Sequence, residues 1–357
     1  MEKSLLQHDG DLINHWYIIC LSRELPSSSK KPISRQVYEK NYVIYRDAEA
    51  IPVVMLDRCP HRGAQLSQGT CHQGTLRCPY HGWTFGKEGR VCEIPSEGPN
   101  TSQASTKKQG EVIPCIEQDG ALWVWIGDPS QKSMLPSWRF PEYKNPGWSQ
   151  YFMITDFTNE VTNLVENFMD VSHTVFVHSK WFRSRRLIEV PLLIEVEKGR
   201  VKATYQQKND SIGFAKSILN PTSEPMVHTD EFIFPNITRV DYNFGTRHFI
   251  INSQCTPLEK NKTRVYTWIC YRLPFIGPFI KPLMQFYTRK VITQDVEIME
   301  NQGANLKRDR NFFSGSHFSN TAADELHIAI EKLRQLGTQD RQSVQQIQYS
   351  KERLFWI

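Results

Sequence analysis

Two short loops in the first third of the chain each carry one cysteine and one histidine. Cys59 and His61 lie in the sequence Arg-Cys-Pro-His-Arg-Gly, Cys78 and His81 lie in Arg-Cys-Pro-Tyr-His-Gly-Trp, and sixteen residues separate His61 from Cys78. Proline follows each cysteine and glycine comes soon after each histidine, a composition typical of tight turns between strands. Two thiolates and two imidazoles from paired loops therefore make a candidate four-ligand metal site.

Three interpretations of these loops compete. Ordinary β-turns with incidental side chains do not explain four metal-ligating residues in matched loops. A structural zinc accepts two cysteines and two histidines, but zinc sites usually pair cysteine with cysteine and histidine with histidine along the chain. A 2Fe–2S cluster, with two cysteines on one iron and two histidines on the other, fits loops that each contain one residue of each kind. The pattern favours the cluster.

A second group of polar residues lies in the segment 166–178, Glu-Asn-Phe-Met-Asp-Val-Ser-His-Thr-Val-Phe-Val-His. The apolar residues of 159–171 recur at helical spacing, which predicts a helix there. Asn167, Asp170 and His173 would lie near one face of that helix, whereas the step of five to His178 leaves it. The two histidines can therefore meet one ion only if the helix ends or distorts near His173. Two imidazoles and a carboxylate bind Fe(II) and leave open positions; the alternative is a helix with a surface aspartate and two capping or core histidines.

Together the two motifs resemble those of the Rieske non-haem iron oxygenases, especially the monooxygenase and demethylase branch that includes dicamba and vanillate demethylases. CPHRG and CPYHGW resemble the Rieske motif, and Asn-x-x-Asp-x-x-His-x-x-x-x-His resembles the catalytic signature. The resemblance covers nearly the whole chain in order and length. It implies a Rieske cluster with Cys59 and Cys78 on one iron and His61 and His81 on the other. It also implies a mononuclear Fe(II) bound by His173 and His178.

The resemblance assigns roles to two further residues of the second motif. Asp170 is expected to bridge His173 to His81 of a neighbouring subunit in a head-to-tail homotrimer, because the two metal centres of one chain lie too far apart in this family. Asn167 occupies a position where the family often has an asparagine near the iron, and a structural polar role explains it equally well.

The third iron ligand is expected to be a carboxylate later in the chain. We choose Asp295, on a helix predicted over 283–302, because the family places its aspartate ligand on a helix at this position. Glu297 and Glu300 are the nearest rivals, and a solvated acidic face is the alternative. Asp230 is a weaker candidate because it opens a predicted strand.

Composition excludes several classes of protein. The 357 residues include 43 Lys and Arg against 38 Asp and Glu, and this net charge of +5 is too dilute for a nucleic-acid partner. Nine tryptophans exclude a disordered chain, and eight cysteines are too few for a disulfide scaffold. The start, MEKSLLQHDGDLINHW, lacks a signal-peptide core, and no run of about 18 apolar residues could span a membrane. We expect a cytoplasmic protein without a transmembrane segment.

The remaining elements predict an α+β fold. A proline-containing stretch at 130–148 separates a small all-β Rieske domain, residues 1–135, from a catalytic domain, residues 136–357, with an antiparallel sheet flanked by helices of the helix-grip type. A late helix over 321–335 is expected to end at Gly337. Strand-like runs lie at 16–21, 42–45, 51–56, 120–127, 152–157, 190–196, 201–206, 229–234, 247–252 and 264–272.

The resemblance implies the terminal oxygenase of a multi-component system. Such an enzyme uses O2, and electrons from NAD(P)H through a separate reductase or ferredoxin, to hydroxylate or N- or O-demethylate a small aromatic or cyclic substrate. No GxGxxG follows a strand here, so the nucleotide is expected to bind another protein. The alternatives are a ring cis-dihydroxylating dioxygenase and a non-catalytic Rieske electron-transfer protein.

Overall fold

The structure is a computed structural model that describes residues 12–27, 29–98, 108–133, 135–136, 138–179, 188–206, 216–274, 276–308, 318–339 and 341–356. The first eleven residues, which bear on the expected absence of a signal peptide, lie outside this set. The chain forms two compact units: the N-terminal unit is Ile13–Arg139, and the C-terminal unit starts at Phe140 and also includes Leu12. Each unit is described by itself.

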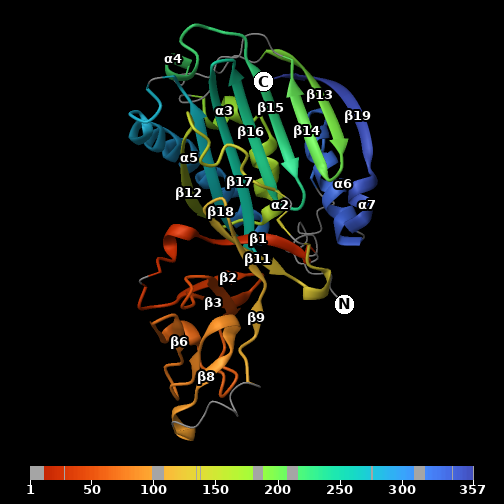
Figure 1. The fold of residues 1–357 in the computed structure, drawn as a ribbon. Helices are drawn as coiled ribbons and strands as arrows, with labels where there is room; N and C mark the ends of the chain where they lie inside the picture. The colour runs from red at the N-terminus through yellow and green to blue at the C-terminus, as the bar shows by residue number, and fades with distance from the viewer. Residues whose placement is uncertain are drawn as a thin grey trace. The chain divides into compact units, whose positions relative to one another are not determined.

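The N-terminal unit is built from three small antiparallel sheets (Figure 1). The strand orders are β1-β11-β10, β2-β3-β4-β9 and β5-β6-β7-β8. The strands are β1 (His15–Leu21), β2 (Ile33–Val37), β3 (Lys40–Arg46), β4 (Pro52–Leu56), β5 (Thr70–His72), β6 (Thr75–Arg77), β7 (Thr84–Phe85), β8 (Val91–Glu93), β9 (Val112–Ile113), β10 (Cys115–Gln118) and β11 (Ala121–Ile126). Short 3-10 turns are η1 (Ser22–Glu24), η2 (Leu66–Gln68), η3 (Lys87–Gly89), η4 (Pro95–Glu97) and η6 (Pro129–Gln131).

The C-terminal unit is organised around an eight-stranded antiparallel sheet of order β12-β18-β17-β16-β15-β14-β13-β19. Its strands are β12 (Ser149–Phe157), β13 (Glu189–Glu197), β14 (Arg200–Tyr205), β15 (Val227–Ile233), β16 (Ile237–Phe244), β17 (Arg247–Glu259), β18 (Lys262–Arg272) and β19 (Gln348–Trp356). The helices are α2 (Val161–Met169), α3 (Thr174–Val177), α4 (Lys216–Leu219), α5 (Lys281–Arg308), α6 (Glu325–Gln339) and α7 (Arg341–Gln346), with a 3-10 turn η9 (Ala322–Asp324) before α6.

One face of this sheet packs against helices (Figure 1). Because successive side chains of a strand point to opposite faces, every second residue lies on the helix side. In β15, His228, Asp230 and Phe232 are buried, whereas Thr229 and Glu231 are half-buried. The core joins apolar residues of α2 and α6 to those of β13 and β14. The sheet therefore forms a wall against which α2, α3 and α5 pack.

The α+β expectation is confirmed, but several elements differ from the prediction. β16, the short strands β2 and β5–β10, and the short helices α3, α4 and α7 were not among the predicted runs. β19 was not predicted because it is a polar edge strand in which Phe355 is the only fully buried residue among the described positions. The predicted end of the late helix at Gly337 is wrong, since α6 continues to Gln339. Gly337 instead permits close packing, because a Cβ there would lie 2.2 Å from the ring of Phe234.

Candidate metal centres

The two Cys–His loops adopt the same turn. The backbone N–H of Gly63 donates to the carbonyl of Cys59 at 2.9 Å, and that of Gly82 donates to the carbonyl of Cys78 at 3.2 Å. Both glycines have left-handed backbone conformations, with φ of 75° and 73°, which glycine adopts without steric cost. The first loop follows β4 and the second joins β6 to β7. The matched motifs thus produce matched turns.

The side chains of these loops fit a metal cluster. Cys59 and Cys78 are each 3% exposed, and burial raises the pKa of the Cys59 thiol. The rings of His61 and His81 lie 4.6 Å apart, and His61 stacks on Trp83 at 4.7 Å. His61 Nδ1 is buried, and no described residue offers it a hydrogen bond. A buried imidazole nitrogen without a protein partner has the character of a metal ligand.

Asp170 ends the helix that carries the second motif. Its backbone turns extended (φ −88°, ψ 111°), and its carboxylate accepts hydrogen bonds from the backbone N–H groups of Ser172 at 2.8 Å and His173 at 3.1 Å. Local bonds of this kind compete with helix continuation. His173 then precedes α3 and His178 follows it. The expected end of the helix before His173 is confirmed, and a single short turn separates the two histidines.

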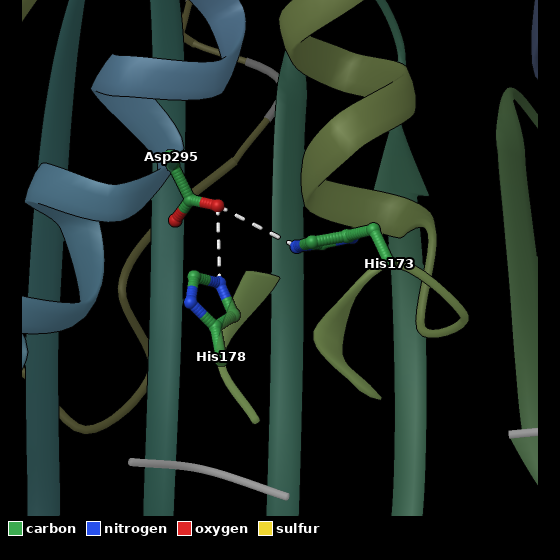
Figure 2. Close-up of side chains that lie close together, drawn as sticks. All are labelled: His173, His178 and Asp295. Atoms are coloured by element: carbon green, nitrogen blue, oxygen red, sulfur yellow. Dashed lines mark ion pairs between the residues drawn. The ribbon is translucent and has the colours of Figure 1, made fainter. Parts of the chain in front are cut away.

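Figure 2 shows His173, His178 and Asp295 converging, with the aspartate projecting from α5. Asp295 Oδ1 lies 3.1 Å from His178 Nε2 and 3.5 Å from His173 Nε2. One ligand atom from each of the three residues lies within 4.8 Å of the others. Bonds of about 2.1 Å set at right angles separate neighbouring ligand atoms by about 3 Å. The three donors therefore fit one ion, and two imidazoles with a carboxylate suit Fe(II).

Mutual ion pairs shift the pKa values in this cluster. Burial opposes the charged form of His173, but Asp170 and Asp295 outweigh it and raise its pKa to about 9. Burial likewise opposes ionisation of Asp295, yet the two histidines lower its pKa. The pKa of Asp170 is also lowered, since hydrogen bonds from His173 and Ser172 exceed the effect of burial. A cation bound here would replace the proton on His173.

Gln294 is a contributor to this site that sequence reasoning missed. Its Oε1 lies 3.0 Å from Nδ1 of His178. An amide oxygen only accepts, so Nδ1 carries the hydrogen and Nε2 is left as the ligand atom. Its position next to Asp295 on α5 was the available signal, but adjacent helical residues do not normally share a face.

Of the other candidate residues, Asn167 and Asp230 line the site, whereas Glu297 and Glu300 do not. Asn167 is 7% exposed and lines a cavity next to His173, His178 and Asp295, and its Oδ1 finds no hydrogen-bond partner in the described part of the chain. Glu297 and Glu300 are exposed on α5, away from the buried Asp295. The expectation that Asp230 opens a strand is wrong. Asp230 lies in the middle of β15, where it is buried and lines the cavity.

The cavity beside the three donors has a volume of about 860 Å³, including its open mouth. The sheet contributes a mostly apolar wall to it, and α5 contributes Tyr287, Thr288, Val291 and Ile292. Such a lining, with a few convergent polar groups, is typical of small-molecule sites. None of the helices in the described ranges is long and apolar enough to cross a membrane.

Comparison with known families identifies the class. The Rieske [2Fe-2S] domain matches residues 15–116, and the vanillate O-demethylase oxygenase C-terminal domain matches residues 160–348. This chain belongs to the Rieske oxygenases that combine these two domains. The family implies a Rieske cluster and a mononuclear iron. The Cys–His loops fit the Rieske cluster, and His173, His178 and Asp295 fit the mononuclear iron.

Individual relatives share the family but differ in length. Chlorophyllide a oxygenase, chloroplastic, of Chlamydomonas reinhardtii is 27% identical over 94% of this chain and 49% of its own length. The oxygenase component of dicamba O-demethylase from Stenotrophomonas maltophilia is 33% identical over 46% of this chain and 47% of its own. The chain thus spans about half the length of the curated relatives it matches. The solved structure of dicamba monooxygenase bound to 3,6-dichlorosalicylic acid shares the fold, with a TM-score of 0.78, 21% identity, and coverage of 92% of this chain and 98% of that one.

Proposed function

We propose that this chain is the terminal oxygenase of a multi-component system that hydroxylates, or N- or O-demethylates, a small aromatic or cyclic substrate. It uses O2 and electrons from a separate NAD(P)H-dependent reductase or ferredoxin. The observation that carries the proposal is the convergence of His173, His178 and Asp295 on an apolar cavity, in a chain that also has paired Cys–His loops. The demethylase relatives support demethylation in particular.

The loops hold the cluster in this proposal. Cys59 and Cys78 bind one iron through buried thiolates, and His61 and His81 bind the other. Neutral imidazoles in place of two thiolates raise the reduction potential of such a cluster. The stacking of His61 on Trp83 fixes one ligand ring against the core.

The cavity wall holds the mononuclear iron. His173, His178 and Asp295 are the ligands, and Fe(II) so bound supplies O2 activation at its open positions. Gln294 fixes the tautomer of His178, and α5 places Asp295 next to the two histidines. Asn167, with its unsatisfied buried oxygen in the described structure, orients a water molecule or the substrate beside the ligands.

Asp170 links the two centres across subunits of a homotrimer in this proposal. Its side chain is 36% exposed while its carboxylate holds the turn at His173, so part of it is accessible for a hydrogen bond to His81 of the partner subunit. Asp170→Asn should retain both metal groups but lower turnover by about 10- to 100-fold. A trimer measured by sedimentation would support the route, and a fully active monomer would sink it.

Other members of the system follow from the relatives. The names "oxygenase subunit" and "oxygenase component" among them support a separate reductase as partner. The cytoplasmic location stays a prediction, because chlorophyllide a oxygenase and TIC 55 relatives carry "chloroplastic" in their names.

Turnover with a surrogate reductase tests the function. Iron-loaded protein, NADH and a panel of methoxy- and N-methyl-substituted aromatic compounds should give O2 uptake and formaldehyde in step with NADH oxidation. His178→Ala should abolish formaldehyde formation and the coupled O2 uptake while leaving the Rieske cluster in place. Formaldehyde formation that survives this substitution, or no oxidised product from any compound, would contradict the proposal.

A further inference from the structure

The cavity wall contains a buried carboxylate that the metal site does not use. Asp230 is 1% exposed and pairs across the sheet with Val240, which pairs in turn with Ile251, and Ile251 with Ile269. All four residues line the cavity. Burial of a carboxylate at the end of an apolar row costs free energy unless its oxygens accept hydrogen bonds.

A stack of aromatic rings fixes the orientation of this carboxylate. Asp230 Oδ1 lies 3.0 Å from His228 Nε2, and the imidazole lies between the rings of Tyr205 and Tyr242, 4.4 and 4.3 Å away. The histidine therefore donates to one carboxylate oxygen. Among the described residues, this bond from His228 is the one side-chain hydrogen bond recorded for Asp230, and Asp230 lines the cavity. A carboxylate oxygen only accepts, so the second oxygen is available for a donor group on a ligand.

Apart from the proposed iron and its ligands, the described lining of the cavity offers no positive charge to compensate a negatively charged substrate. Neither lysine nor arginine occurs among the described residues that line it. A substrate carboxylate near Asp230 would meet a like charge in a poorly hydrated space. A hydroxyl or N–H group would instead satisfy the free oxygen.

From this arrangement we infer that Asp230 is the polar anchor of the substrate. It accepts a hydrogen bond from a hydroxyl or N–H group on an otherwise apolar ring and discriminates against carboxylates. The inference rests on the proposed function for the identity of the cavity as a substrate site, and it narrows the substrate class. It assigns Asp230 to specificity instead of iron binding.

Calorimetric binding to the iron-loaded protein under anaerobic conditions tests the anchor with three matched probes. These are 3-methoxyphenol, methoxybenzene and 3-methoxybenzoate, which differ in a single ring substituent. Wild-type protein should bind the phenol at least about tenfold more tightly than either of the others, since a hydrogen bond to a charged group is worth that factor. Asp230→Asn should weaken phenol binding by about tenfold and strengthen benzoate binding by a similar factor.

Asp241 provides a matched control. It also pairs with a histidine, His248, but lies on β16 between the inward-facing Val240 and Tyr242, and so on the opposite face of the sheet. Asp241→Asn should leave the ranking of the probes unchanged. The same shift in both variants, tightest wild-type binding of the benzoate, or no binding of the phenol would overturn the inference.

The wild-type ranking needs no variant to fold, so the inference stays testable if Asp230→Asn is unstable. Binding is also measured without turnover. A phenol-first ranking in a protein that never oxygenates would refute the proposed function and leave the anchor standing. Oxygenation of carboxylate probes in preference to phenols would do the reverse.

Discussion

The two candidate metal centres are constructed in opposite ways. The Cys–His loops take all four donors from one stretch, Cys59 to His81, and shape them with backbone hydrogen bonds inside each turn. The second centre joins His173 and His178 to Asp295, more than a hundred residues later on α5. Its geometry therefore depends on packing between helices and sheet.

This difference in construction matches a difference in exposure to ligands. The thiols of the first centre are enclosed in the core of a small β domain, which suits a cluster that only exchanges electrons. The second centre has three donors on one side and a cavity on the other, which suits a metal that must bind substrates. The comparison predicts that the two centres can be damaged separately.

Removal of one ligand from each centre should have the largest effect. Cys78→Ser should eliminate the cluster signal and retain mononuclear iron, whereas His178→Ala should do the opposite. Both variants should show no turnover above background, because the reaction requires both centres. Iron analysis and electron paramagnetic resonance of each variant measure this.

The control for these substitutions is Cys71→Ser, since Cys71 lies between the loops in β5 and has no assigned role. It should retain both metal groups. Loss of both groups from a folded Cys78→Ser or His178→Ala protein would show that the centres are not independent.

A substitution behind a ligand should have an intermediate effect and would sharpen the comparison. Gln294→Ala leaves His178 without its 3.0 Å partner, so the affinity for Fe(II) should fall by about 10- to 100-fold. The cluster should be unaffected. Gln285→Ala, at an exposed position on the same helix, is the matched control, and equal losses of Fe(II) affinity in both variants would contradict the role of Gln294.

The smallest effect is a pH dependence of stability confined to the second centre. The raised pKa of His173, about 9 against an ordinary 6.5, stabilises the metal-free fold. That contribution is complete below about pH 6.5 and is lost as the pH rises through about 9. The melting temperature of metal-free protein should fall by a few degrees across this interval.

Two comparisons isolate that effect. Iron replaces the proton on His173, so the iron-loaded protein should lose this alkaline dependence. The metal-free His173→Asn variant should lack it as well. The lowered pKa values of Asp170 and Asp295 act at the other end: their contribution is complete above the usual carboxyl pKa and is lost as the pH falls below it, through the lowered values. An identical alkaline slope in the metal-free wild type and His173→Asn would contradict the assignment.

How far the sequence could predict these centres depends on how local their geometry is. The loops were recognisable because a Cys–His turn is encoded within a few residues, and the end of α2 near His173 followed from the spacing of five. Asp295 could be chosen only by resemblance, because no local pattern connects α5 to α2. The ligand roles themselves remain predictions.

Other features depended on tertiary context that local patterns do not carry. Gln294 supports His178 only because of how α5 packs against the α2–α3 turn. The local pattern placed Asp230 at the start of a strand. Its burial could not be predicted, because it arises from the strand register that pairs Asp230 with Val240. Gly337 looked like a helix end, but its lack of a side chain accommodates Phe234.

The most direct test of the central claim, that this chain holds a Rieske cluster and a separate mononuclear iron, is electron paramagnetic resonance of anaerobically purified, dithionite-reduced protein with iron counted per chain. We expect a rhombic Rieske-type signal and about three irons per chain, two in the cluster and one at His173, His178 and Asp295. Zinc without such a signal would contradict the cluster. The signal with only two irons, and none regained on addition of Fe(II), would contradict the oxygenase and leave an electron carrier.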